Sequence, residues 1–164
     1  MGTDILEIIR RAYQLEVDGY TFYTMTAGQA RKPTVRKLFE RLAQDERQHQ
    51  QYLREVSNHY DQKGNAAFDV PRDTPDLDAF TTSVFTEELR KEAEGAEFEA
   101  AVLSVGMTLE SNSIAHYNGA SRAATNDQAR AFYQFLAVWE RQHLVALQNA
   151  YRAVRTDFWN KSGL

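Results

Sequence analysis

The four residues ERQH occur twice in this chain, at residues 46–49 and again, letter for letter, at residues 140–143. Residues three apart on a helix lie on the same face, so the Glu and the His of each copy direct a carboxylate and an imidazole toward one point. Each copy can therefore form half of a metal site. One such pair is weak evidence, because Glu and His on a helix usually belong to a solvated face. Two identical pairs suggest an internal duplication.

A common offset relates other positions of the chain to the two ERQH copies, which are 94 residues apart. Glu16 and Glu110 are related by this offset, and each stands 30 positions before the Glu of one copy. Five further pairs share the offset: Tyr23 and Tyr117, Arg36 and Arg130, Leu42 and Leu136, Ala43 and Ala137, and Leu53 and Leu147. A repeat of this length predicts two copies of one helical hairpin.

Apolar residues at helical spacing predict four long helices. Pro33 suits the first turn of the second helix and Gly64 its end, while Thr125 and Gln128 form a capping box that opens the fourth. The first predicted long helix ends near residue 30. The second spans 33–63, the third spans 97–123, and the fourth runs from 125 to about 158. A loop over 65–75 and a short helix over 86–93 make a long connection between the second and third helices. The predicted fold is all-α, a four-helix bundle of two duplicated hairpins with a long crossover.

The repeated positions supply four Glu and two His as predicted metal ligands: Glu16, Glu46, His49, Glu110, Glu140 and His143. One Glu from each of two helices, with Glu-x-x-His from each of the other two, is the set that a four-helix bundle uses to hold two metal ions. The four carboxylates contribute a charge of −4, which two divalent ions neutralise. Oxidation to two trivalent ions can be offset by an oxide or hydroxide derived from oxygen, peroxide or water. This balance favours iron chemistry with small oxidants.

Other polar residues near the predicted ligands have two open interpretations, which are hydrogen bonding to the ligands and ordinary packing or exposure: Tyr20, Tyr23, Tyr117 and Asp45. Trp139 stands where the repeat would place a second Asp45, so the symmetry is broken there. His116 lies about 240° around the helix from Glu110, and His59 lies roughly 15 Å along the axis from His49. Neither His59 nor His116 is predicted to be a ligand.

Composition limits the possible functions of the chain. Its 164 residues are 43% apolar and 26% charged, which predicts one domain over residues 1–164. The net charge of −4 provides no basic surface for nucleic acid. No run of about 18 apolar residues and no secretory signal is seen, so a cytoplasmic protein without a membrane partner is expected. The absence of Cys excludes disulfides, thiol catalysis and iron–sulfur clusters.

Four segments resemble the rubrerythrin-like branch of the ferritin-like superfamily, and together they span nearly the whole chain: LEVDGYTFY at 15–23, DERQH at 45–49, LESNSIAHY at 109–117 and WERQH at 139–143. The resemblance implies a ferritin-like four-helix bundle. It also implies that Glu46 and Glu140 bridge the two metals and are the catalytic residues. Glu16 and Glu110 would each be terminal ligands, and the two histidines would each complete one metal.

Two departures from rubrerythrins bear on function. Ser113 stands where rubrerythrins carry an additional carboxylate, and the four-cysteine rubredoxin module has no counterpart in this sequence. Electrons are therefore expected from a separate protein or small reductant. The predicted function is a non-haem di-iron oxidoreductase that reduces peroxide or oxygen, with a homodimer as the expected assembly. An iron-binding or ferroxidase protein and a dimanganese catalase-like enzyme stay open, whereas a metal-free interaction protein would leave the duplicated ligand set without a purpose.

Overall fold

The structure is a computed structural model that describes residues 5–63 and 77–162. Within these ranges the chain forms helices and connecting turns, with no β-strand. The helices, in chain order, are α1 (Ile5–Gln29), α2 (Pro33–Lys63), the short 3-10 helix η2 (Asp78–Phe80), α3 (Ser83–Lys91), α4 (Glu97–Ala123) and α5 (Asp127–Ser162). The all-α prediction is confirmed. The predicted bounds of α4 match, whereas the loop predicted at 65–75 lies outside the described residues.

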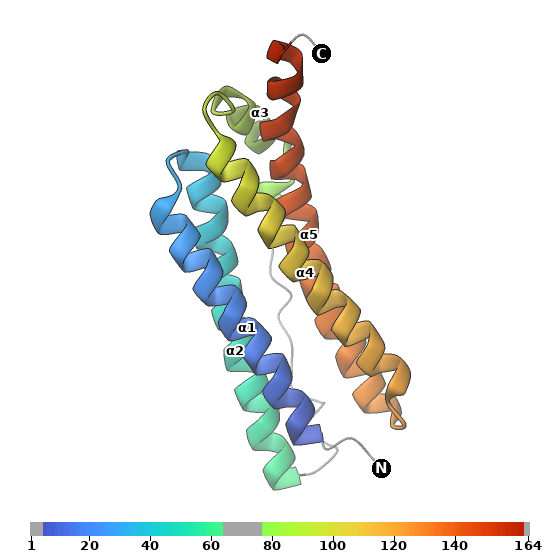
Figure 1. The fold of residues 1–164 in the computed structure, drawn as a ribbon. Helices are drawn as coiled ribbons and strands as arrows, with labels where there is room; N and C mark the ends of the chain where they lie inside the picture. Colours follow the sequence, from blue (N-terminus) through green and yellow to red (C-terminus); the bar gives the residue numbers. More distant parts are fainter. Residues whose placement is uncertain (1–4, 64–76, 163–164) are drawn as a thin grey trace.

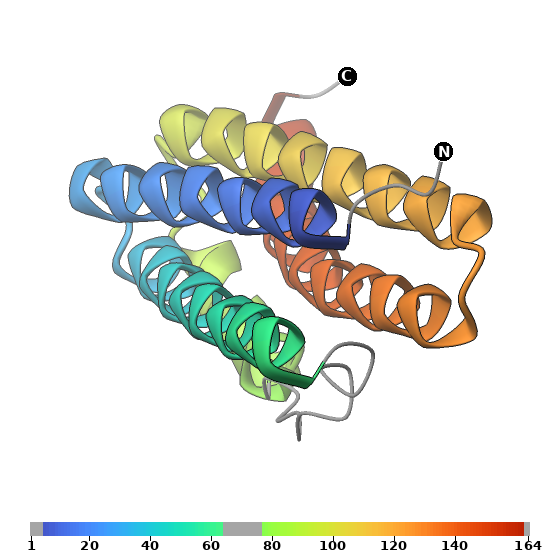
Figure 2. The ribbon, with the colours of Figure 1, turned by 90° about the horizontal axis from the view of Figure 1, so that it is seen from below.

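The four long helices form two hairpins, as the repeat predicts. Helix α1 packs along α2, and α4 packs along α5. The two hairpins lie side by side with α1 next to α4, as the view along the bundle shows (Figure 2). The chain crosses between the hairpins after α2, and α3 belongs to this crossover and packs against α5 (Figure 1). The structure is therefore the ferritin-like bundle of two hairpins with a long connection between the second and third long helices.

Two apolar clusters fill the bundle. One contains Leu38, Phe39 and Leu147, and the other contains Leu53 and Phe132, all of them buried. On each long helix the predicted ligands stand between residues of the first cluster and residues of the second. The polar centre is thus enclosed by apolar layers along the bundle axis, and burial of these layers supplies the main stabilisation of the fold.

Acidic side chains from the second half of the chain cap the start of α2. The buried carboxylate of Glu99 accepts hydrogen bonds from the backbone N–H groups of Arg31 (2.7 Å) and Lys32 (3.2 Å). Glu92 accepts from both the backbone N–H (3.0 Å) and the hydroxyl (2.7 Å) of Thr34. N–H groups at a helix start have no partner within the helix and favour negative charge. These contacts therefore join the first hairpin to the crossover and the second hairpin.

The start of α5 differs from the predicted capping box. The side chain of Asn126 accepts hydrogen bonds from the backbone N–H groups of Gln128 (2.7 Å) and Ala129 (3.3 Å), while Thr125 is exposed. The prediction that Thr125 and Gln128 form the cap is therefore wrong by one residue. Asn is at least as good a cap as Thr, and here it lies immediately before the first helical residue.

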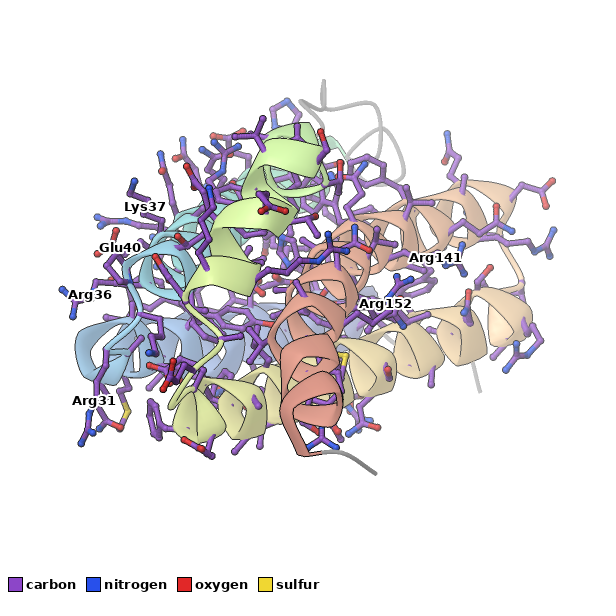
Figure 3. The ribbon with its side chains drawn as sticks, turned by 90° about the horizontal axis from the view of Figure 1, so that it is seen from above. Arg31, Arg36, Lys37, Glu40, Arg141 and Arg152 are labelled. Carbon is purple, nitrogen blue, oxygen red and sulfur yellow. The ribbon has the colours of Figure 1, made fainter. Side chains whose placement is uncertain are left out.

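Apart from Glu99, which caps α2, most charged side chains of the described residues outside the bundle centre lie on the surface. Lys37, Glu40 and Arg141 are exposed and point away from the helix interfaces (Figure 3). None of the described helices combines the length and the apolar character that a bilayer crossing requires. The buried acids of the centre are thus exceptions to the pattern of the molecule, and their burial needs a physical explanation.

Replacing Glu99 by Ala should lower the free energy of unfolding by about 1–3 kcal/mol, because two N–H groups at the start of α2 lose their acceptor. For a domain of this size the melting temperature should fall by roughly 3–10 °C. Thermal unfolding followed by circular dichroism checks this. Glu97→Ala is the matched control, since Glu97 is exposed on the same helix and its loss should change stability by less than about 0.5 kcal/mol. Equal effects of the two substitutions would contradict the capping role of Glu99.

Candidate metal centre

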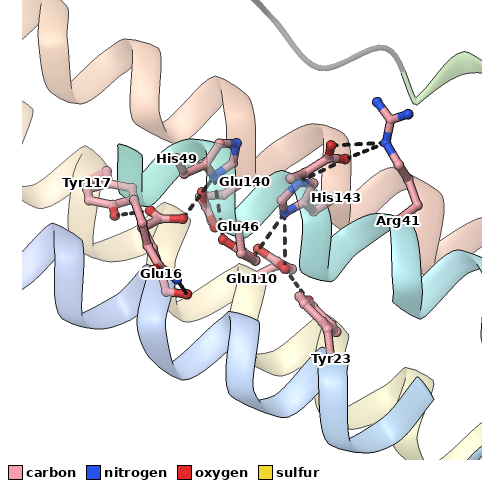
Figure 4. Close-up of polar contacts among 11 residues, drawn as sticks. Glu16, Tyr23, Arg41, Glu46, His49, Glu110, Tyr117, Glu140 and His143 are labelled. Carbon is pink, nitrogen blue, oxygen red and sulfur yellow. Dashed lines mark hydrogen bonds and ion pairs between the residues drawn. The ribbon is translucent and has the colours of Figure 1, made fainter. Parts of the chain in front are cut away.

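The six residues predicted as metal ligands lie together in the middle of the bundle (Figure 4). Each hairpin contributes one Glu from its first helix and a Glu-x-x-His pair from its second. All six residues are buried, and none of them, taken whole, is more than 3% exposed. They are Glu16 on α1, Glu46 and His49 on α2, Glu110 on α4, and Glu140 and His143 on α5.

The six side chains form two overlapping groups of four. In the first group, one ligand atom from each of Glu16, Glu46, His49 and Glu140 lies within 4.8 Å of the others, and the second group joins Glu46, Glu110, Glu140 and His143 at the same separation. Glu46 and Glu140 belong to both groups. The offset of 94 residues exchanges one group for the other, so the repeat in the sequence corresponds to a repeat in space. This arrangement has the form of two adjacent cation positions that share two carboxylates.

Both imidazole rings turn the same nitrogen toward the acids. The Nδ1 atom of His49 lies 2.9 Å from Oε2 of Glu16 and 3.5 Å from Oε2 of Glu46. The Nδ1 atom of His143 lies 3.4 Å from Oε1 of Glu46 and 3.5 Å from Oε1 of Glu110. The Nε2 atoms therefore point away from the centre, and only Nδ1 of each ring is placed to bind a cation there.

Two buried tyrosines hold the carboxylates that belong to only one group. The hydroxyl of Tyr117 on α4 donates to Oε1 of Glu16 on α1, at 2.9 Å. The hydroxyl of Tyr23 on α1 donates to Oε1 of Glu110 on α4. The two bonds are exchanged by the repeat and cross between the hairpins. Of the interpretations left open for the tyrosines, hydrogen bonding therefore applies to Tyr23 and Tyr117, whereas Tyr20 lines a pocket on the surface of α1 and α2.

Asp45 and Trp139 occupy equivalent positions of the repeat, and each lies next to the histidine of the other hairpin. Asp45 is fully buried, accepts from Nε of Arg41 at 3.0 and 3.2 Å, and places Oδ2 at 4.0 Å from Nε2 of His143. Its carboxylate therefore lies beside the imidazole of the other hairpin, while its negative charge also acts to raise the pKa of His49, one turn away on its own helix. Trp139 stacks on His49, with ring centroids 3.9 Å apart and an interplanar angle of 7°.

The shared carboxylates have strongly perturbed protonation. Burial raises the pKa of Glu46 and Glu140, and the negative charge of Glu16 raises the pKa of both further. Burial also acts to raise the pKa of Glu16, but the charge of His49 and hydrogen bonds outweigh it and lower this pKa to about 2. Without a cation, Glu46 and Glu140 are thus the carboxyls that retain protons.

His143 is held in a strongly acidic environment. Burial acts to lower the pKa of this imidazole, but the negative charge of Glu110, whose Oε1 lies 3.5 Å from Nδ1, raises the pKa to about 9. A proton on His143 and protons on the shared carboxyls therefore offset negative charge in the centre. Metal cations would perform the same role, and their binding would release these protons.

Unsatisfied polar atoms show that the donor set fits metal ions. Among the described residues, Oε2 of Glu46, Oε1 of Glu140 and Nδ1 of His143 are buried without a hydrogen-bond partner. Buried polar atoms rarely lack a partner in native proteins. Carboxylate and imidazole donors together suit iron, manganese or zinc. The residues present therefore fit a centre of two metal ions, one for each group of four.

A close approach of α1 to Glu46 was not predicted from the sequence. A Cβ atom built on Gly19 would lie 2.8 Å from Oε1 and 3.0 Å from Cδ of Glu46, which is shorter than any ordinary contact. Glycine inside a helix lowers helix stability by about 1 kcal/mol relative to Ala. The presence of Gly19 in the middle of α1 could therefore have indicated a close packing contact. The pairing of Arg41 with Asp45, four residues apart on one helix, could also have been noticed. His59 and His116 are exposed, as expected for histidines outside the site.

Comparison with known proteins identifies the family. A family model described as Rubrerythrin matches residues 7–151, a range that contains all six residues of the centre. Comparison with curated proteins and with solved structures gives no match. The family model covers most of the chain, and the fold and the two buried groups of four are consistent with it. The chain therefore belongs to the rubrerythrin family.

Proposed function

We propose that this protein is a non-haem di-iron oxidoreductase that reduces peroxide, or oxygen, with electrons from an external donor. The observation that carries the proposal is the pair of overlapping groups, in which Glu46 and Glu140 are common to both. In this proposal residues 1–164 act as one domain. Glu16 and His49 complete one metal position, Glu110 and His143 complete the other, and Glu46 and Glu140 bridge the two ions as the catalytic residues.

Charge supports a pair of divalent cations. The four carboxylates carry −4 when ionised, and the groups around them are buried. Isolated buried carboxylates are very unfavourable, so the protein must either hold protons or bind cations of equal total charge. Two divalent ions satisfy this condition and also supply partners for the unpaired oxygen and nitrogen atoms of the centre.

The surrounding residues prepare the site for a small oxidant. Two bound iron ions would supply one electron each, the two electrons that convert a peroxide and two protons into two water molecules. Tyr23 and Tyr117 fix the orientation of Glu110 and Glu16 by donating to one oxygen of each. Because Gly19 has no side chain, the carboxylate of Glu46 fits closely against α1. The apolar layers on both sides exclude bulk water, and a site so enclosed favours small substrates.

The electron donor is proposed to be a separate molecule. The 164 residues contain no Cys, so they cannot form a rubredoxin-type iron site. Within the described residues there is also no strand followed by a Gly-rich turn, which is the element that binds a dinucleotide in many reductases. A small redox protein or a chemical reductant therefore has to restore the reduced centre after each turnover.

Metal should stabilise the fold. A ligand present at about 100 times its Kd stabilises the folded state by about 2.7 kcal/mol, so Fe²⁺ added anaerobically should raise the melting temperature of the metal-free protein by roughly 5–10 °C. Glu46→Gln should remove most of this gain, because it takes one shared carboxylate from both positions. Without metal, this variant should be at least as stable as the parent, since a buried acid is replaced by a neutral side chain. An unchanged melting temperature after removal of metal by a chelator would contradict the proposal.

Gly19→Ala should weaken metal binding, because the added methyl group displaces the carboxylate of Glu46. We expect a loss of affinity of about tenfold or more, comparable with the loss of an outer partner of a metal ligand. Gly28→Ala is the matched control on the same helix, since nothing lies within 4 Å of its Cβ position. Competition with a coloured chelator measures both variants. Equal affinities for the two variants would mean that Gly19 does not shape the site.

The reduced, iron-loaded protein should consume about one peroxide per centre rapidly and then stop until a reductant is added. Stopped-flow mixing with a peroxide assay measures this stoichiometry, and metal analysis of protein purified without added metal identifies the ions. Sustained turnover with NADH alone would contradict the need for an external donor. Peroxide disproportionation without any reductant, by protein that contains manganese, would instead support the dimanganese catalase-like alternative.

A further inference from the structure

The repeat relates the surroundings of the two metal positions as well as their ligands. The bond from Tyr117 to Glu16 is matched by the bond from Tyr23 to Glu110, so the first ring of partners is the same on both sides. The match fails at the residue that precedes the Glu of each ERQH copy and lies next to a histidine of the other hairpin. The position that is Asp45 in the first hairpin is Trp139 in the second. Equal ligands are therefore held in unequal surroundings.

A negatively charged carboxylate lies near Nε2 of His143. Oδ2 of Asp45 lies 4.0 Å from Nε2 of His143, whereas Nδ1 of the same ring faces Glu46 and Glu110. Arg41 holds the Asp45 carboxylate in place through its Nε, at 3.0 and 3.2 Å. Asp45 is 0% exposed, so water does not screen its charge from the ring. The fully buried carboxylate favours a proton on Nε2 and leaves Nδ1 free to bind a cation.

Aromatic side chains cover one face of the His49 ring. Trp139 lies parallel to the imidazole at a centroid distance of 3.9 Å, and Phe135 and Tyr52 pack on the indole at 4.5 and 5.2 Å. Within the described part of the chain, the buried Nε2 atoms of His49 and His143 both lack a hydrogen-bond partner, and that of His143 lies within ion-pair distance of Asp45, at 4.0 Å. The indole Nε1 of Trp139 is likewise buried and unpaired there.

These surroundings should change metal affinity in opposite directions. A histidine that binds metal through Nδ1 keeps its proton on Nε2, and a carboxylate beyond that proton makes the ring a better ligand. Neither Nε2 atom has an acceptor at hydrogen-bond distance, but the negative charge of Asp45 lies 4.0 Å from that of His143, whereas uncharged Trp139 covers the face of the His49 ring. Loss of such outer partners typically weakens metal binding by about 10–100-fold. The two positions therefore differ although their ligand types are identical.

We propose that the two metal positions fill in order, with the His143 position binding the first ion and the His49 position binding the second at least about tenfold more weakly. Asp45 is the positioning residue that creates the difference in metal affinity. Because the equivalent residue of the second hairpin is the uncharged Trp139, the His49 position has no matching carboxylate from the repeat. The inference rests on the proposed function, because it takes the six residues as the ligands. It adds that the protein alternates between a one-metal and a two-metal form when metal is scarce.

The test is a titration of the metal-free protein with Co²⁺, a divalent ion that does not oxidise readily at such a site. Isothermal calorimetry, with equilibrium dialysis to count bound ions, should show two steps of one ion each. His143→Ala should abolish the tighter step, and His49→Ala should abolish the weaker step and leave the tighter one. If the parent protein binds no Co²⁺, the proposed function itself fails. Two steps of equal affinity, or joint binding of both ions, would overturn only the ordered filling.

Asp45→Asn distinguishes a positioning role from a general effect on the fold. This substitution keeps the shape of the side chain and removes its charge, so it should weaken the tighter step about tenfold and the weaker step by clearly less, because the carboxylate lies closest to His143. Trp139→Phe is the matched control at the equivalent position, because it keeps an aromatic ring on His49 and offers no acceptor. It should leave both steps within about threefold of the parent. Equal weakening of both steps by Asp45→Asn would overturn the assignment.

Discussion

Mutual repulsion among four carboxylates, held in one dry space between two helical hairpins, is the constraint on which the rest of this structure depends. Glu46 and Glu140 respond to it by holding protons, since burial and neighbouring charge raise the pKa of both. Glu16 remains ionised through its contacts with His49 and Tyr117. An apolar centre would form a more stable bundle with less difficulty. The arrangement is understandable as a site that cations complete.

The centre exists only when the two hairpins are docked. Each group of four takes ligands from both hairpins, and each tyrosine donates to a carboxylate across the interface between α1 and α4. The capping of α2 by Glu99 and Glu92 adds a second polar connection at the end of the bundle. Formation of the site and docking of the hairpins are therefore coupled, because neither hairpin alone holds a complete set of ligands.

Duplication explains the common geometry, and divergence explains what distinguishes the two sides. The ligands and the tyrosines have kept their chemistry at both positions of the repeat. Behind the histidines, Asp45 and Trp139 have not, and the result is one imidazole supported by charge and one enclosed by aromatic rings. A two-metal centre with equal ligands can thus have unequal positions, because the affinity of a metal site depends on the partners of its ligands as well as on the ligands.

The sequence by itself determined the helical fold, the two hairpins and the six residues that meet, because helical spacing and a constant offset are local properties that survive without coordinates. It left Tyr23, Tyr117 and Asp45 undecided, and it placed the cap of α5 one residue early. Only the tertiary structure decided that Asp45 faces His143 across the bundle, that Trp139 stacks on His49, and that Gly19 lies against Glu46. These contacts join residues of different helices. They depend on how the helices rotate and cross when they pack, which no spacing within a single helix specifies.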